Sequence, residues 1–319
     1  MALERPTCST TLRSLSDELI LLILRNFCAH CREGPHESQY AYLVETKRLV
    51  YELDWYALDV SALCSMTLVS KRFSPLAQEV LYHEFAPGHD YYSTLDERSS
   101  EVYDWYWRLE PFLRIVAQNP ARAAFVKRLH VNANVLCCVV EDGTYEGGIL
   151  KDVAQARGID IYNFAGFFEA LRPQIEPYRY LPQADALLGM LLTCLPRLKT
   201  LTFSTGAPLL GVPASALRAA GLSALRIQTL GIIWCDDSLE FRLGGILELA
   251  SATIRNLRLN SCNEQGLSGL TRHGPFPNLR SFCIANSRVS GSDLASFLSC
   301  HVDLETCSYH SGTFPAKPL

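Results

Sequence analysis

The sequence lacks an apolar run long enough to cross a membrane. A membrane-spanning helix needs about 20 consecutive apolar residues, and a stretch such as Leu19–Leu24 is far shorter. The opening segment MALERPTCSTTLRSL also lacks the apolar core of a secretory signal. We therefore expect a cytoplasmic or nuclear protein, or one found in both compartments, with no membrane contact.

The sequence also lacks an excess of charge of either sign. Its 29 lysine and arginine residues nearly balance 33 aspartate and glutamate residues, for a formal net charge of −4. Nucleic-acid-binding proteins usually carry a basic excess on one face, so we expect no nucleic-acid partner. The 48% hydrophobic content allows a sizeable core. A chain of 319 residues is long enough for two domains or one elongated array.

Sequence patterns of common active sites are absent as well. There is no glycine-rich phosphate loop, no G-x-S-x-G elbow and no HExxH pair. Gly147-Gly148 and Gly244-Gly245 lack the rest of a nucleotide-binding fingerprint, and Asp236-Asp237 is more typical of a solvated turn than of a metal site. The sequence does not exclude a cysteine nucleophile, although no cysteine has neighbours in sequence that would lower its thiol pKa. Enzymatic activity is the least supported class, and we predict no catalytic residue, cofactor or metal.

The sequence contains 12 cysteines, most of them in apolar or repeat-like surroundings. Such cysteines are typical of free thiols in a reducing compartment. The one metal-like spacing is Cys28-Ala29-His30-Cys31, with His36 nearby. A zinc finger needs a second ligand pair at a suitable distance, and none follows in the sequence. We interpret this segment as unpaired thiols at a helix end.

The N-terminal part predicts a small helical unit. Ser16 is expected to cap its first helix, with Asp17 and Glu18 in the first turn, where carboxylates suit the positive helix end. Its apolar residues form a stripe with the i, i+4, i+7, i+8 spacing of an amphipathic helix, through Leu15, Leu19, Leu22, Ile23 and Phe27. Leu21 and Leu24 make this stripe wider than one small core requires.

A helix junction is predicted within MTLVSKRFSPLAQEVLY, residues 66–82. One helix is expected to end near Phe73, and the next to begin at Pro75 with Ser74 as its N-cap. Lys71 and Arg72 then occupy the last turn of the earlier helix, where cations suit the negative helix end. Residues 86–125 are expected to connect this unit to the rest of the chain, with a helix over residues 111–118 that stops before Asn119-Pro120.

Beyond residue 125 an apolar-x-x-apolar-x-apolar motif returns. From the second copy on, the first positions are 198, 227, 254, 279 and 304, which are 29, 27, 25 and 25 residues apart. This spacing matches the roughly 20–29 residues of leucine-rich repeats. The last two apolar positions are expected to point inward from a short strand, and a helix between strands to cover them. The copies begin at Val126, Leu198, Ile227, Ile254, Leu279 and Leu304.

The predicted fold class is therefore α/β. It comprises a helical unit over residues 12–85 and a curved leucine-rich repeat solenoid with a parallel strand face over residues 126–319. An irregular insertion is expected near residues 132–196, because the first two motif copies are far apart. The alternative is an ordinary α/β domain with short strands at similar intervals.

Two segments of the helical unit resemble the F-box family in the form common among fungal sequences. LSDELILLILRNF corresponds to the family's opening Leu-Pro-x-Glu-Leu helix, and ALCSMTLVSKRFSPLAQEVLYHEF to its later Leu-Val-Ser-Lys-Arg-Phe segment. Ser16 stands where the family usually has proline, and an extra stretch near residues 28–55 separates the halves. The resemblance covers residues 12–85, and the remainder follows the general plan of an F-box followed by repeats.

This resemblance implies a non-catalytic, substrate-recognition subunit of an SCF-type E3 ubiquitin ligase, acting in ubiquitin-dependent protein degradation. The F-box would dock the adaptor subunit of the cullin complex, and the repeats would bind a protein substrate. The alternative is a leucine-rich repeat interaction scaffold without a ubiquitin-ligase role. The implied adaptor-binding residues are Leu15, Asp17, Glu18, Leu19, Leu22, Ile23, Leu68, Val69, Lys71, Arg72 and Phe73.

Strand residues that flank the inward positions are expected to form a small, polar and nearly uncharged concave face. Arg258 is its only formal charge, and Trp234 would add an aromatic anchor. We predict a hydrogen-bonding surface for a neutral or weakly acidic peptide. The alternative is that small residues merely suit close strand stacking. The tentative substrate contacts are Thr202, Trp234, Asn256, Arg258, Asn260 and His310.

Overall fold

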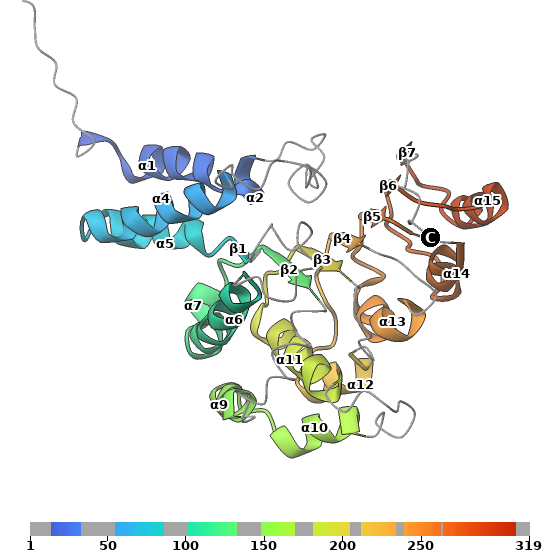
Figure 1. The fold of residues 1–319 in the computed structure, drawn as a ribbon, viewed down its shortest axis with the longest axis horizontal. Helices are drawn as coiled ribbons and strands as arrows, with labels where there is room; N and C mark the ends of the chain where they lie inside the picture. Colours follow the sequence, from blue (N-terminus) through green and yellow to red (C-terminus); the bar gives the residue numbers. More distant parts are fainter. Residues whose placement is uncertain are drawn as a thin grey trace, which may run out of the picture. The chain divides into compact units, whose positions relative to one another are not determined.

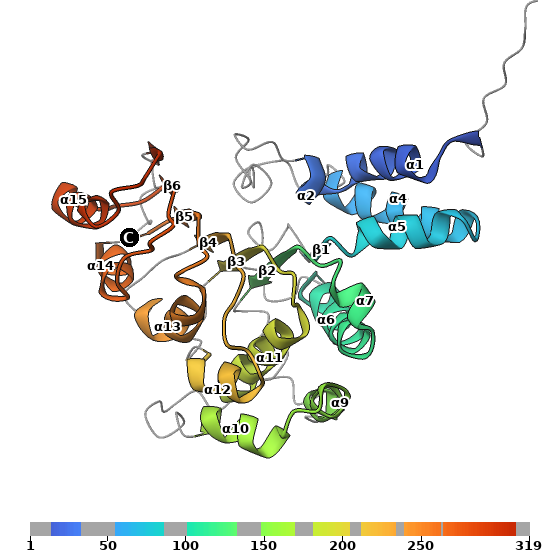
Figure 2. The same cartoon turned by 180° about the vertical axis from the view of Figure 1, so that it is seen from behind.

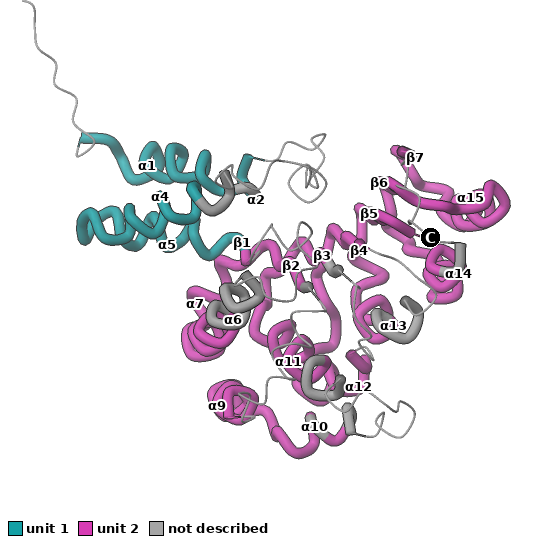
Figure 3. The backbone as a smooth tube through the Cα atoms, in the orientation of Figure 1, with its two compact units in different colours: residues 1–84 teal, residues 85–319 magenta. Residues whose placement is uncertain are grey.

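The chain folds as two compact units in the computed structural model, unit 1 of residues 1–84 and unit 2 of residues 85–319 (Figure 3). Their boundary lies next to the end of the predicted helical unit at residue 85. No helix in the described part of the chain is both long and apolar enough to cross a membrane. The structure describes residues 14–32, 55–85, 101–132, 148–169, 181–204, 212–233, 239–262 and 264–310.

Unit 1 is helical in its described part (Figure 1). Ser16 caps the first helix as predicted, because its side chain accepts a hydrogen bond from the backbone N–H of Leu19 at 3.5 Å. Asp17 and Glu18 occupy the first turn, also as predicted. The elements are α1 (Asp17–Leu24), the 3₁₀ helix η2 (Arg25–Phe27), α2 (Ala29–Arg32), α4 (Trp55–Val69) and α5 (Phe73–Leu81).

One buried cluster holds α1, α4 and α5 together. Each fully buried aliphatic or aromatic side chain of this kind contributes about 1.5–3 kcal/mol relative to exposure. The cluster therefore stabilises the arrangement of these three helices. Its buried members are Ile20, Leu24, Cys28, Leu63, Phe73, Ala77 and Val80.

The junction between α4 and α5 differs from the prediction. α5 begins at Phe73, before the expected start at Pro75. Arg72 stands at the N-cap position in place of Ser74, and the Ser70 hydroxyl accepts a hydrogen bond from the backbone N–H of Phe73 at 3.2 Å. Pro75 still lies in the first turn, where backbone N–H groups have no partner within the helix.

Unit 2 is an α/β domain built on an open parallel sheet. Strand order follows sequence order, from β1 to β7, and β2 to β7 pair in parallel. The predicted α/β class is confirmed. The strands are β1 (Glu84–Phe85, at the unit boundary), β2 (Arg128–Asn132), β3 (Thr200–Ser204), β4 (Thr229–Ile233), β5 (Asn256–Asn260), β6 (Ser281–Ala285) and β7 (Thr306–His310).

In all six copies of the predicted motif, the last two apolar positions fall on a strand, and the strands share one register. The period found in the sequence is therefore the period of the strands. The first row across the sheet is Leu129, Leu201, Leu230, Leu257, Phe282 and Cys307. The second is Val131, Phe203, Ile232, Leu259, Ile284 and Tyr309.

A repeated backbone contact joins each strand to the next. The carbonyl of Lys127 accepts hydrogen bonds from the N–H groups of Lys199 and Thr200, at 2.8 and 2.9 Å. The same double acceptance recurs at the carbonyls of Lys199, Gln228, Arg255 and Arg280, with distances of 2.7 to 3.0 Å. Backbone atoms thus set the spacing of the strands just before each one begins.

One helix follows each strand from β3 to β6, and these helices lie on the same side of the strand row (Figures 1 and 2). Their inward side chains, with those of the strands, form the core of unit 2. These helices are α12 (Ala214–Ala219), α13 (Leu239–Ala250), α14 (Glu264–Arg272) and α15 (Gly291–Ser299). The insertion between β2 and β3 contains α9 (Gly148–Arg157), α10 (Ile161–Glu169) and α11 (Leu181–Cys194).

The connecting segment is more helical than predicted. Helix α6 spans Glu101–Gln118, so the helix begins well before the expected start at Pro111. Proline was expected at a helix start because its ring suits the first turn, yet Pro111 lies inside α6 at an exposed position. Asn119 ends α6 as predicted and caps the short helix α7 (Pro120–Ala123) through the N–H of Arg122 at 3.1 Å.

Candidate functional site

Helix α1 exposes large apolar side chains on one face. Leu19, Leu22 and Ile23 are 48%, 60% and 41% exposed, and their i, i+3, i+4 spacing places them side by side. Ile20 and Leu24 follow Leu19 and Ile23 by about 100° of helix rotation and are buried in the core of unit 1. The helix is therefore apolar on two faces, and the described part of unit 1 covers one of them.

Helix α4 adds exposed apolar residues near both of its ends. Leu68 and Val69 at its C-terminus are 86% and 63% exposed, and Leu58 near its start is 51% exposed. Nine large apolar side chains are exposed in the described residues, and six of them belong to unit 1, the smaller unit. Single exposed leucines are ordinary, but such a concentration is typical of a binding surface. We call Leu19, Leu22, Ile23, Leu58, Leu68 and Val69 the apolar set of unit 1.

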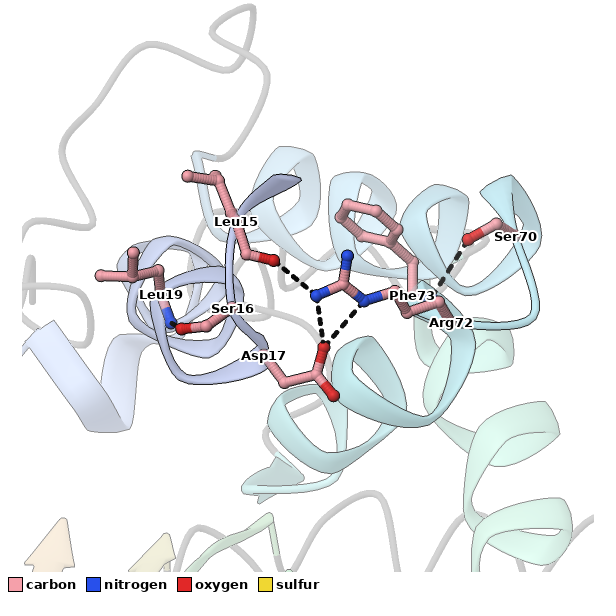
Figure 4. Close-up of polar contacts among 7 residues, drawn as sticks. All are labelled: Leu15, Ser16, Asp17, Leu19, Ser70, Arg72 and Phe73. Atoms are coloured by element: carbon pink, nitrogen blue, oxygen red, sulfur yellow. Dashed lines mark hydrogen bonds and ion pairs between the residues drawn. The ribbon is translucent and has the colours of Figure 1, made fainter. Parts of the chain in front are cut away.

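Arg72 ties the turn between α4 and α5 to the start of α1 (Figure 4). Its Nε donates to Asp17 Oδ1 at 2.8 Å, and its terminal nitrogen lies 2.7 Å from the same oxygen and donates to the carbonyl of Leu15. Both side chains are partly exposed, so the ion pair contributes only about 0.2–1 kcal/mol. Its main effect is geometric, because it joins the two segments that resemble an F-box.

Lys71 and Arg72 lie in the turn after α4, not in its last turn as predicted, because α4 ends at Val69. Lys71 is exposed and follows Val69 of the apolar set by two residues in the sequence. Glu18 is exposed and directly precedes Leu19. The backbone N–H of Glu18 and the hydroxyl of Ser16 hold the pKa of the Glu18 carboxyl below its usual value. Charges of both signs therefore accompany the apolar set at neutral pH.

Two of the predicted adaptor contacts pack within or against the core of unit 1. Phe73 is only 7% exposed and belongs to the buried cluster, and Leu15 is half-buried and packs against that cluster. Figure 4 shows Phe73 beside Arg72 at the start of α5. Phe73 and Leu15 hold unit 1 together, whereas the other predicted contacts are exposed.

The predicted substrate residues are exposed to different degrees. Thr202 and Asn260 are buried, at 5% and 7% exposure. Asn256 and Arg258 are half-buried, and His310 is exposed on the last strand. Trp234 lies outside the described residues. Register places Thr202 in one row across the sheet with Gly231, Arg258, Cys283 and Ser308.

Part of the hydrogen-bonding capacity of these polar residues is used between strands. Asn256 Nδ2 donates to the hydroxyl of Thr229 on the neighbouring strand at 3.1 Å. Asn286 Nδ2 donates to Asn260 Oδ1 at 3.1 Å. These contacts favour a stacking role for Asn256 and Asn260, which lie on either side of Arg258 on β5. We call the row that contains Thr202 and Arg258 the middle row.

No family model matches the chain, and no curated protein matches it either.

Sequence reasoning missed one cluster in unit 1. Cys28, His30 and Cys31 come together with His83, which follows α5. Because His83 is 52 residues beyond Cys31, no fixed ligand spacing links the two in sequence. The segment Cys28-Ala29-His30-Cys31 was the only available signal, and it supplies three of the four side chains.

Proposed function

We propose that this protein is the substrate-recognition subunit of an SCF-type E3 ubiquitin ligase and that the apolar set of unit 1 docks the adaptor subunit. The observation that carries the proposal is the exposure of Leu19, Leu22, Leu68 and Val69 on the two segments that resemble an F-box. An amphipathic helix normally buries its apolar stripe. A second polypeptide is the simplest way to cover a stripe that the described part of unit 1 leaves exposed.

The energetics suit a protein partner. Full burial of a leucine-sized side chain is worth about 1.5–3 kcal/mol, and a few such residues at the centre of an interface supply most of its affinity. The contact between Arg72 and Asp17 holds α1 against the α4–α5 turn before any partner arrives. A preformed surface of this kind loses little conformational entropy on binding.

The charges near the apolar set would act mainly on association. Lys71 and Glu18 are both exposed, so a partner can meet each of them at the rim of the contact. Rim charges steer encounter and fix orientation more than they add affinity. An adaptor surface with an acidic patch opposite Lys71 fits this arrangement.

For unit 2 the finer fold that we propose is a curved leucine-rich repeat solenoid that binds the protein substrate. Three features support it: a strand order that follows the sequence, one register for all motif copies, and a backbone contact that recurs between strands. Stacked repeats of this type bury a continuous core and leave one strand face for partners. Arg258 in the middle row is the proposed contact for a neutral or weakly acidic substrate segment.

Binding of the full-length chain to a purified SCF adaptor subunit tests the docking proposal. Leu19→Glu combined with Val69→Glu places two charges in the apolar set, and we expect the affinity measured by calorimetry to fall at least tenfold. Both side chains are exposed, so the fold should survive. Val302→Glu is the matched control, because Val302 is an apolar residue of unit 2 that is 92% exposed.

Two results contradict the docking proposal. One is the absence of adaptor binding by the unmodified chain, which is the outcome expected of an interaction scaffold without a ubiquitin-ligase role. The other is equal binding by the double variant and by Val302→Glu. Either result leaves the apolar set without the proposed partner.

A further inference from the structure

Four side chains that commonly bind metal ions meet within unit 1. Cys28, His30 and Cys31 lie on the segment from η2 into α2, and His83 follows the C-terminus of α5. One ligand atom from each lies within 4.8 Å of those of the other three. The cluster is thus built from two parts of the chain that fold against each other.

The distances match a small tetrahedral centre. Cys31 Sγ lies 3.2 Å from His83 Nδ1 and 3.6 Å from His30 Nδ1, and Cys28 Sγ lies 3.9 Å from His83 Nδ1. A zinc ion bound at about 2.3 Å from sulfur and about 2.0–2.1 Å from nitrogen places sulfur and nitrogen ligands about 3.6 Å apart. The observed separations lie on both sides of that value, so an ion fits with small side-chain movements.

The surroundings of the cluster favour a closed site. Cys28 and His83 are 4% and 5% exposed, whereas Cys31 and His30 are half-buried. Two thiolates would balance the charge of a divalent cation, so the loaded site would be electrically neutral and could be buried at low cost. Thiols alone are weak hydrogen-bond partners for imidazole, which gives the unloaded cluster little reason to be enclosed.

Neighbouring contacts hold the ligand segment in place. The backbone N–H of His30 donates to Glu84 Oε2 at 3.1 Å. Arg32, directly after the cluster's second cysteine, forms an ion pair with Asp59 of α4. These contacts link α2 both to the end of unit 1 and to its longest described helix, so the ligands are positioned before a metal binds.

We propose that Cys28, His30, Cys31 and His83 bind a single Zn²⁺ ion as a structural site. Thiolate with imidazole is a ligand set that suits zinc and disfavours magnesium or calcium. Four protein ligands complete a tetrahedral shell and leave no position for a reacting water. The site fastens α2 to the residue that follows α5, and it does not depend on the proposed ligase function.

Metal analysis of the full-length chain, purified without a histidine tag and with its thiols reduced, tests the proposal. We expect one zinc per chain by elemental mass spectrometry. A strong chelator should remove it and lower the melting temperature of unit 1. Substitution with Co²⁺ should give the visible absorption of a tetrahedral, thiolate-ligated ion, a readout that needs no variant.

Variants then assign the ligands. Cys31→Ser and His83→Gln should each lower zinc affinity at least tenfold. Cys64→Ser should not, because Cys64 is an exposed cysteine of the same unit outside the cluster. In the unmodified chain, zinc should protect Cys28 and Cys31 from alkylation and leave Cys64 reactive.

Three results would overturn the assignment. The first is an unmodified chain that takes up neither Zn²⁺ nor Co²⁺. The second is alkylation of Cys31 at the same rate with and without zinc, as expected of a free cysteine nucleophile. The third is a zinc affinity that is unchanged in both Cys31→Ser and His83→Gln.

Discussion

Within unit 1, neighbouring apolar residues have opposite surroundings. Phe73 and Leu68 both belong to the Leu-Val-Ser-Lys-Arg-Phe segment, yet Phe73 is 7% exposed and Leu68 is 86% exposed. The sequence shows both as apolar and cannot separate them, because burial depends on where α4 ends and α5 begins. At the start of α5, the Ser70 hydroxyl accepts a hydrogen bond from the N–H of Phe73.

Replacing Phe73 tests this difference. Phe73→Ala should destabilise unit 1 by about 3–5 kcal/mol, since it removes a large buried side chain and leaves a cavity. Leu68→Ala should change stability by less than about 0.5 kcal/mol, because its side chain is exposed. Hydrogen exchange of the α1 and α5 amides in the full-length chain measures both effects. Equal exchange in the two variants would contradict the burial difference.

For whole elements, local signals predicted helix ends well where the cap lies next to the helix. Ser16 with an acidic first turn identified the start of α1, and Asn119 the end of α6. Prediction failed at Pro111, because proline is tolerated inside a helix when other contacts hold that helix together. The start of α5 was misplaced because Ser74-Pro75 is a common helix-start signal, whereas the helix begins two residues earlier, at Phe73.

Helix α13 contains the pair Gly244-Gly245, and the packing around Gly245 explains why a glycine stands there. A Cβ on Gly245 would lie 2.0 Å from the carbonyl oxygen of Val212 and 2.4 Å from the nitrogen of Ala214. Both are backbone atoms, so they cannot move aside as a flexible side chain would. Gly245 therefore permits close approach of α13 to the segment that begins α12.

Matched alanine substitutions test this packing. In an open helix position, glycine to alanine stabilises by up to about 1 kcal/mol, and we expect this of Gly166→Ala in α10, where a Cβ would meet nothing within 4 Å. Gly245→Ala should instead destabilise by about 1–3 kcal/mol through overpacking. Thermal unfolding of the two variants should shift in opposite directions. A shift in the same direction would show that the backbone contact is not limiting.

At the scale of the whole molecule, the repeat period was the most predictable feature. The motif copies gave the strands and their register, because apolar residues at fixed spacing must meet when repeats stack. The zinc-ligand cluster was not predictable, since His83 reaches it only through the fold of α4 and α5. The exposure of the apolar set was equally hidden, because a stripe in sequence does not say whether its own domain covers it.

Side chains at equivalent positions in different strands should contribute unequally to the free energy of unfolding. Leu230 and Cys307 share one row of the sheet, but Leu230 is fully buried in β4 and Cys307 is exposed in β7. Leu230→Ala should cost about 2–5 kcal/mol, and Cys307→Ala less than about 0.5 kcal/mol. Urea unfolding of unit 2 in the full-length chain measures the difference. A large loss for Cys307→Ala would mean that another part of the chain covers β7.

The paired N–H contacts to the carbonyls of Lys127, Lys199, Gln228, Arg255 and Arg280 involve no side chain. Every amino acid except proline supplies both the donor and the acceptor that such a contact needs. Amino acids other than proline can therefore replace one another at these positions without loss of the backbone contacts. Proteins of this architecture should keep their shape long after comparison of their sequences has ceased to reveal common ancestry.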